Sequence, residues 1–419
     1  MLARLLGRAL ANAATGTLCM LGTLSVMGST LQPVAARAQG PGSAAQAPGL
    51  AAQAPGLAAQ APGLAAQAPK LDAQAPKLFE VAVAGGRFVG MPVHWGRHDA
   101  VVLEPSGRMQ FFEQHNVEAH RTLAVDFAPL TITEARVQLQ NELGPRYETV
   151  VFGPYVLAAP VGQAERWRGR FSSLLAGYMR YFDVRHWSLR RPDFPLCVVV
   201  YATREEFLAY SQTEIRQIPT SMVGCYSPRS NRCALYNIEL GNESSGAGGA
   251  RLTNWSETEA TIVHEAVHQL AYNTGIHQRL SMDPLWFIEG LASMFEQPSV
   301  YDLRQQQATT LSRRDDARTQ RLRSLVNQPS LLLEHLQSLT ASDELFQRSP
   351  AVAYDLSWAL AFYLAERMPT ELRQYSSRLA TRPFGEYASH HREQDFRQAF
   401  GGDLSLLAGR LSRLLQEAQ

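Results

Sequence analysis

The sequence has no large excess of charge of either sign. Its 419 residues include 39 Lys or Arg and 38 Asp or Glu, so the formal net charge is +1. Proteins that bind nucleic acid usually carry a clear basic excess, and no nucleic-acid partner is predicted. One local group of arginines alternates with Asp315 and Asp316, which is typical of a solvated helix face. This group consists of Arg313, Arg314, Arg318, Arg321 and Arg323.

Cysteine is also scarce, with four in the whole chain. Cys225 and Cys233 flank a predicted turn and could face each other across a hairpin, which makes them a candidate disulfide with Cys197 left free. Their spacing excludes a Cys-rich zinc site. The chain also lacks a G-x-S-x-G motif, a phosphate-binding loop and a dinucleotide fingerprint, so these common enzyme classes have no support in the sequence.

Apolar runs long enough to span a bilayer are missing from the sequence, except near the N-terminus. Arg4 and Arg8 precede a mostly apolar run over 9–31, and residues 36–38 form an A-x-A cleavage site. We predict a signal peptide over 1–38 and export to the periplasm, the cell envelope or the medium. An uncleaved membrane anchor is the alternative.

A repeated heptapeptide follows the predicted signal. The unit Ala-Ala-Gln-Ala-Pro-Gly-Leu begins at 44, 51 and 58, and two altered copies begin at 65 and 72. A proline in every unit breaks the helix ladder, so the seven-residue period does not indicate a coiled coil. We interpret 39–78 as a disordered linker that spaces the rest of the chain from a membrane or cell wall, with a partner-binding array as the alternative.

The most informative motif is H-E-x-x-H, formed by His264, Glu265 and His268. The apolar periodicity around it predicts a helix over 257–274, on which residues four apart share one face. Two imidazoles at this spacing can bind one zinc ion, and the glutamate between them can act as a general base. The metzincin pattern has a third histidine at the position that Thr274 occupies here, so the sequence does not favour that class.

The third ligand is predicted on a second helix that begins near Asp283 and Pro284. Glu289 lies on this helix, and the adjacent Gly290 has no side chain that would hold the two helices apart. Glu289 is therefore the preferred third ligand. His277 and Asp283, in the loop between the helices, are the alternatives.

These residues resemble the gluzincin (thermolysin-like, peptidase-MA) zinc metallopeptidases. The resemblance rests on H-E-x-x-H followed by Trp286-Phe-Ile-Glu-Gly-Leu-Ala292, and the fuller string is similar to a poorly characterised branch of secreted bacterial proteins that carry a domain of unknown function. It implies one Zn²⁺ bound by His264, His268 and Glu289, with Glu265 as the general base. It also implies hydrolysis of peptide bonds in a peptide or protein substrate.

The expected fold is α+β: a gluzincin-like catalytic domain with a small mixed sheet, an HExxH helix and a helical C-terminal lobe, preceded by a small β-rich module. Short strand candidates from 80 onward predict the module, and an apolar segment over 351–364 predicts a core helix in the lobe. The expected boundaries are 1–38 for the signal, 39–78 for the linker, 79–158 for the β-rich module, 159–300 for the α/β half and 301–419 for the helical lobe.

Three further site features are weaker candidates. Tyr354 is a candidate for stabilising the transition state, and no other histidine or tyrosine matches that position of the family. Glu296 lies two turns after Glu289, and is either a partner of a ligand or an ordinary helix carboxylate. The segment 231–237 is the candidate edge strand for binding substrate backbone.

A binding protein is the competing hypothesis from another class. In it, the repeat linker displays an inactive metallopeptidase-like fold at the cell envelope, and zinc is structural or absent. Inactive relatives of enzymes often lose the general base, whereas Glu265 is present here. The sequence therefore favours the zinc-dependent hydrolase.

Overall fold

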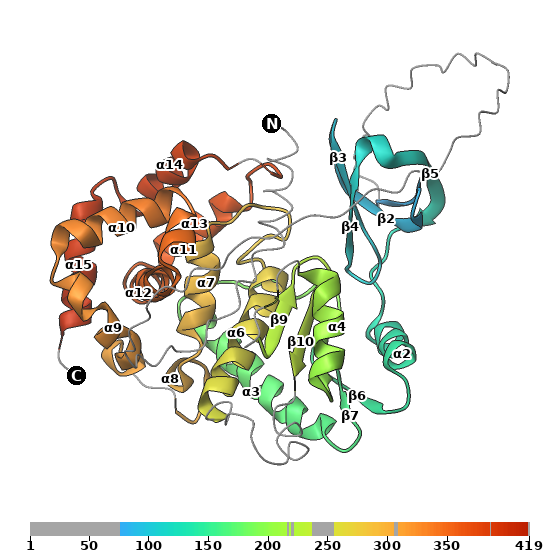
Figure 1. The fold of residues 1–419 in the computed structure, drawn as a ribbon, viewed down its shortest axis with the longest axis horizontal. Coiled ribbons are helices and arrows are strands. Elements are labelled where there is room, and N and C mark those ends of the chain that lie inside the picture. Colours follow the sequence, from blue (N-terminus) through green and yellow to red (C-terminus); the bar gives the residue numbers. More distant parts are fainter. Residues whose placement is uncertain are drawn as a thin grey trace, which may run out of the picture.

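The computed structural model describes residues 76–215, 218, 222–236, 255–305, 309–385 and 387–417. Within them the fold is mixed α+β, with two small sheets and a helical C-terminal region (Figure 1). The predicted signal peptide and almost all of the predicted linker lie outside the described residues. No helix among the described residues has the length and apolar character needed to cross a bilayer.

The first sheet is an antiparallel sheet of five strands in the order β4-β3-β2-β1-β5. Its strands are β1 (Lys77–Val83), β2 (Gly86–Trp95), β3 (Asp99–Leu103), β4 (Met109–Glu113) and β5 (Val117–Asp126), with a short 3-10 turn over Gln114–Asn116. Val81, Val101 and Met109 form part of its buried apolar layer. Residues 77–126 are therefore β-rich.

The second sheet is mixed and has the order β6-β7-β8-β10-β9. Its strands are β6 (Tyr147–Phe152), β7 (Tyr155–Pro160), β8 (Leu196–Tyr201), β9 (Gly224–Ser227) and β10 (Arg232–Tyr236). β7, β8 and β10 run parallel, while the two outer strands run antiparallel to their neighbours. β6 lies within the predicted range 79–158 and β7 crosses its end, yet both belong to the second sheet. The first sheet ends with β5 at Asp126, well before the predicted boundary at 158.

Helices cover both faces of the second sheet. One apolar cluster joins one face to α3 (Ala164–Asp183) and α6 (Trp255–Thr274), and a second cluster joins the other face to α2 (Ile132–Leu143) and α4 (Arg204–Glu214). Trp167, Phe171 and Tyr178 of α3 are buried in the first cluster, as expected from their helical spacing. Both faces of the sheet are therefore shielded from water.

The remaining helices form the C-terminal region beside this sheet (Figure 1). The central helix α12 packs along α7, and both are buried over most of their length. The region consists of α7 (Leu285–Met294), α8 (Pro298–Tyr301), a 3-10 turn (Leu311–Arg313), α9 (Asp316–Val326), α10 (Pro329–Ala341), α11 (Glu344–Arg348), α12 (Pro350–Arg367), α13 (Pro369–Leu379), α14 (Ser389–Phe400) and α15 (Leu404–Gln416). The predicted core helix over 351–364 corresponds to α12.

The candidate disulfide between Cys225 and Cys233 is wrong. Both residues are buried free thiols on the adjacent strands β9 and β10. Cys225 pairs in register with Ala234, and Cys233 pairs with Tyr226. The two cysteines are thus one residue out of register and belong to the apolar clusters on opposite faces of the sheet.

Candidate metal centre

Helix α6 carries the three residues of the H-E-x-x-H motif in its central turns. It spans Trp255–Thr274, so it begins two residues earlier than predicted and ends at the predicted residue. His264 and His268 lie on one face, and their Nε2 atoms are 3.0 Å apart. The exposed fractions of His264, Glu265 and His268 are 2 %, 1 % and 3 %. The helix therefore presents two imidazole nitrogens to one buried point.

Helix α7 brings a carboxylate to the same point. Glu289 Oε2 lies 3.2 Å from His264 Nε2 and 3.7 Å from His268 Nε2. One ligand atom from each of the three side chains lies within 4.8 Å of the others. Of the described residues, only this group has such a potential metal-binding geometry. The structure thus brings together the three residues that the sequence predicted as ligands.

Gly290 has a different role from the predicted one. A Cβ atom at Gly290 would lie 2.3 Å from the backbone oxygen of Ser357 and 2.9 Å from Cβ of Ala361, both on α12. The missing side chain therefore permits close packing of α7 against α12, rather than against the motif helix α6. This packing fixes the helix that carries Glu289.

The chemistry of the three donors fits a divalent cation such as zinc. Two imidazole nitrogens and one carboxylate oxygen form a common zinc ligand set. Glu289 Oε1 is buried without a hydrogen-bond partner, so the carboxylate retains unused acceptor capacity. Burying such an acceptor without a partner is costly, and a cation at this point would remove that cost.

The electrostatics of the three side chains depend on their mutual contacts. Burial lowers the pKa of His264, but its contacts with Glu289 and Glu296 outweigh burial and raise that pKa to about 10. Burial raises the pKa of Glu289, but His268 and His264 outweigh it and lower that pKa to about 2. The carboxylate is therefore ionised, and a cation that binds here displaces a proton from the imidazole.

Glu265, beside these donors on the motif helix, contacts the second sheet. Its Oε2 accepts a hydrogen bond of 2.7 Å from the backbone N–H of Tyr226 in β9. A Cβ atom at Gly224 would lie 3.2 Å from Cγ of Glu265, so the glycine allows the strand to approach this side chain. The backbone of β9 thus fixes the orientation of the candidate general base.

The edge strand beside the motif is β9 and not the predicted segment 231–237. The described part of that segment is β10, which pairs with β8 on one side and with β9 on the other. Both strands are short and apolar, and their order in the sheet depends on long-range pairing that local sequence does not encode. Residues 224–227 therefore form the edge of the sheet nearest Glu265.

Glu296 is a partner of a predicted ligand. It lies just beyond the C-terminal end of α7, and its Oε1 is 2.8 Å from His264 Nδ1. Its second oxygen accepts a hydrogen bond of 2.7 Å from Arg318. Burial raises the pKa of Glu296, but Arg318 and His264 outweigh it, so the pKa lies below its ordinary value. Glu296 is therefore an ionised acceptor behind the imidazole.

The two alternative ligands in the loop pair with each other. His277 Nδ1 lies 3.0 Å from Asp283 Oδ2, and Asp283 also accepts a hydrogen bond from Ser281. Asp283 precedes Pro284, which is the N-cap of α7, so the helix begins close to the predicted position. Neither residue is part of the three-residue donor group.

Tyr354 lies on α12, where its ring packs edge-on against Phe346 with a centroid distance of 5.3 Å. This contact places the ring within the helical region. Its assignment as a transition-state stabiliser stays a prediction.

Sequence reasoning missed two features of the site. The contact from Tyr226 uses a backbone N–H, which no residue pattern reveals. Arg318 belongs to the arginine group interpreted as a solvated helix face, yet it is only 4 % exposed. Arg314 of the same group is also buried, whereas Arg321 is exposed. Only the carboxylates at Asp315 and Asp316 hinted that these arginines have nearby partners.

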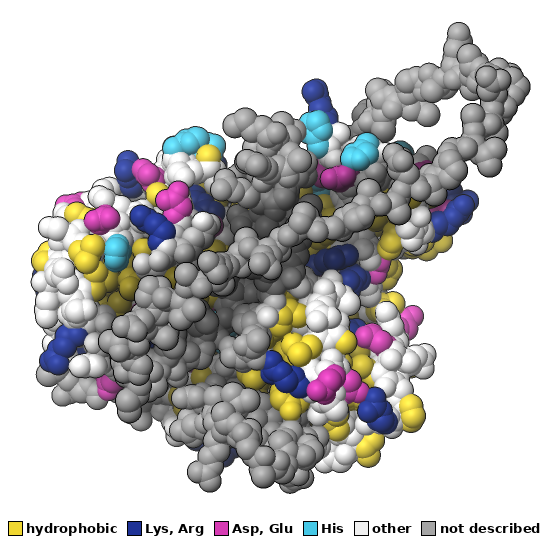
Figure 2. Space-filling view, in the orientation of Figure 1, with side chains coloured by type: hydrophobic (Ala, Val, Ile, Leu, Met, Phe, Trp, Pro, Cys, Tyr) yellow, Lys and Arg dark blue, Asp and Glu magenta, His cyan; other side chains and the backbone are white. Residues whose placement is uncertain are grey.

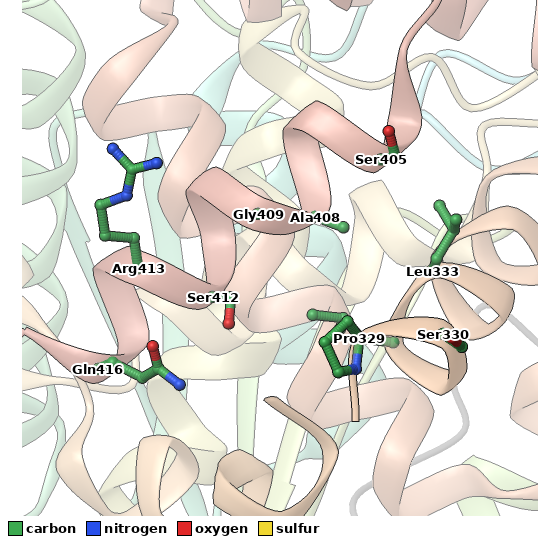
Figure 3. Close-up of a pocket in the computed structure, with 10 residues that line it drawn as sticks. Pro329, Ser330, Leu333, Ser405, Ala408, Gly409, Ser412, Arg413 and Gln416 are labelled. Carbon is green, nitrogen blue, oxygen red and sulfur yellow. The ribbon is translucent and has the colours of Figure 1, made fainter. Parts of the chain in front are cut away.

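A hollow at the surface of the described residues lies apart from the metal centre. Figure 3 shows a hollow between α10 and α15, lined by Pro329, Arg413 and Gln416 among others. None of the metal-centre residues lines it. On the face shown in Figure 2, cationic and anionic side chains are interspersed. The buried triad is therefore the best candidate site in the described part of the chain.

Fold and site together define a mixed α+β protein with a candidate three-ligand metal centre. Residues 258–384 match a family described as "Protein of unknown function (DUF1570)". This match includes His264, Glu265, His268 and Glu289, but neither of the two sheets. A search of curated proteins found no match to the chain.

Proposed function

We propose that this protein is an exported zinc-dependent hydrolase of the gluzincin type that cleaves peptide bonds. The observation that carries the proposal is that two imidazole nitrogens and one carboxylate oxygen lie within 4.8 Å of one another. Glu265 lies on the same helix as the two histidines. A zinc ion held by His264, His268 and Glu289 would polarise a substrate carbonyl and acidify a water molecule.

The role of Glu265 follows from its position and chemistry. As a carboxylate next to the donor group, it accepts a proton from the water that adds to the carbonyl carbon. It returns this proton to the amine nitrogen when the C–N bond breaks, so that a carboxylic acid and an amine leave. The hydrogen bond from the Tyr226 backbone holds one carboxylate oxygen during both transfers. The choice of a peptide bond rests on the resemblance of the motifs to gluzincins.

The test compares the wild-type chain with Glu265→Gln on a mixed peptide library, with cleavage products identified by mass spectrometry. Loss of a general base lowers the rate by about 10²–10⁴-fold, while zinc binding and folding should remain. Removal of the metal with a chelator should abolish cleavage, and added zinc should restore it.

Glu259→Gln is the matched control, because Glu259 lies on the same helix and contacts Tyr301 rather than the donor group. This variant should cleave at the wild-type rate. Equal cleavage by Glu265→Gln and the wild type would contradict the proposed enzyme. Zinc binding without any cleavage would instead favour an inactive binding protein at the cell envelope.

A further inference from the structure

The ring of His264 has contacts on both nitrogens, and the two sides differ. Nε2 faces His268 and Glu289, where a cation would bind. Nδ1 faces Glu296 Oε1 at 2.8 Å. A carboxylate at Nδ1 keeps the ring proton on that nitrogen and leaves the Nε2 lone pair for a metal. The orientation of Glu296 therefore decides whether His264 can act as a ligand.

A single guanidinium group holds Glu296 in this orientation. Arg318 Nη2 donates to Glu296 Oε2 at 2.7 Å, and Nη1 donates to Asp355 Oδ1 at 3.0 Å. Nε lies 3.4 Å from Asp315 Oδ2. The planar guanidinium thus contacts three carboxylates in fixed directions, which an ammonium group cannot reproduce.

The contacts of Arg318 join separate elements of the helical region to the motif helix. Arg318 is on α9, Asp355 is on α12, and Glu296 follows α7. Arg321 donates two further hydrogen bonds of 2.7 Å to Asp355 from the side nearer solvent. A continuous chain of contacts therefore runs from α12 and α9 to the imidazole of His264.

A salt bridge that only stabilises the fold would explain why these charges are buried. It would not explain why the network ends on a ring nitrogen of His264. Buried ion pairs often add little net stability, since desolvation offsets their attraction. Here the network ends at Nδ1 of His264, while Nε2 of the same ring faces the point where a metal would bind. Groups that hydrogen-bond a metal-bound histidine commonly change metal affinity by about 10–100-fold.

We propose that Arg318 is a positioning residue of the metal centre. By fixing Glu296, it sets the tautomer and ring orientation of His264. Through Arg318 and Asp355, helices α9 and α12 therefore help to determine the affinity of the cation site. This inference rests on the proposed function only in requiring that a divalent cation occupies the triad.

The test measures zinc affinity of the full chain by competition with a chromophoric chelator, together with the visible absorption of the cobalt-substituted protein. Arg318→Lys keeps the positive charge but loses the planar guanidinium with its donors in fixed directions. This variant should bind zinc about 10-fold more weakly or worse, and its cobalt spectrum should differ from that of the wild type. Arg392→Lys is the control, because Arg392 is also buried and makes a two-bond contact with a carboxylate, Asp343. Zinc affinity in this control should stay within about threefold of the wild type.

The outcomes separate this inference from the proposed function. Wild-type affinity in Arg318→Lys, or equal losses in both lysine variants, would overturn the positioning role while the zinc site stands. Absence of zinc binding in the wild type would overturn both. If Arg318→Lys does not fold, Glu296→Gln serves instead, because it keeps the shape and removes the carboxylate from His264. That variant should also lose about 10-fold in affinity, and wild-type affinity in it would overturn the inference.

Discussion

The two five-stranded sheets of this protein differ in how much of their surface is covered. Five of the six residues of β7 in the second sheet are buried, whereas none of the ten residues of β5 in the first sheet is buried. Apolar clusters cover both faces of the second sheet. The outer strand β5 of the first sheet is exposed. This sheet contacts the rest of the chain at the turn before β4 and through ring contacts of His94 and Phe111 with Phe384.

This difference explains where the candidate chemistry lies. The second sheet supports α6 and positions Glu265 through β9, so its rigid surroundings can hold a site within a narrow geometry. The first sheet meets the same region at the turn after β9, where Met109 N donates to Arg229 O at 2.7 Å. Arg279 donates to the backbone oxygens of Gly107 and Pro228 at the same junction. The first sheet therefore touches the site region, but none of its strands supplies a residue to the donor group.

The comparison predicts the largest change in the free energy of unfolding where α3, which covers the second sheet, packs against α8. A Cβ atom at Gly177 would lie 1.6 Å from the backbone oxygen of Tyr301 in α8. Gly177→Ala must push these helices apart, and we expect a loss of about 3 kcal/mol or more in the free energy of unfolding. Denaturant unfolding followed by circular dichroism measures this change.

Two matched glycines control for the alanine substitution itself. Gly169 lies on the same helix, and the position that its Cβ atom would occupy has nothing within 4 Å, so Gly169→Ala should stabilise by about 0.5–1 kcal/mol. Gly90→Ala would place a Cβ atom 2.4 Å from Leu103 O, a clash inside the first sheet. It should perturb that sheet and leave zinc content unchanged. Loss of zinc in Gly90→Ala would contradict the claim that the second sheet, and not the first, supports the metal centre.

A smaller change in the free energy of unfolding is expected when the ion pairs that join α3 to the helical region are broken. Glu366 of α12 accepts hydrogen bonds from Tyr181, Arg185 and Arg313. Burial raises the pKa of Glu366, but Arg313 and Arg185 outweigh it and hold that pKa below its ordinary value. The stabilisation is therefore present above about pH 4.5, the unfolded value, and is lost as pH falls through the folded pKa.

Glu366→Gln should lower the free energy of unfolding by about 2 kcal/mol at pH 7. Because the variant has no carboxylate to protonate at this position, its free energy of unfolding should also decrease less than that of the wild type below about pH 4.5. Urea unfolding at several pH values measures both effects. Glu80 of the first sheet is the control, because it also contacts two arginines, Arg87 and Arg121, at the surface. Exposed pairs of this kind contribute little, so Glu80→Gln should show no comparable change. Equal pH profiles for Glu366→Gln and the wild type would contradict this account.

The sequence predicted the parts of the site that depend on spacing within one helix or between neighbouring helices. His264, Glu265 and His268 follow from helical geometry, and Glu289 follows from its place on the next helix. The general α+β character and the buried helix over 351–364 also follow from hydrophobic periodicity.

The remaining features depend on tertiary contacts that no local pattern encodes. The position of β9 at the sheet edge, the contact of Gly290 with α12 and the burial of Arg318 each require knowing which distant segments meet. The cysteines illustrate the same limit. Their spacing allowed a hairpin disulfide, but a one-residue difference in register places them on opposite faces.

The most direct test of the central claim is the zinc content of the purified wild-type chain, compared with Glu289→Ala. A three-ligand site predicts about one zinc per chain in the wild type and a weakened or lost metal in the variant. Absence of zinc from the wild type, even after incubation with the metal, would contradict the proposed metal centre and the hydrolase built on it.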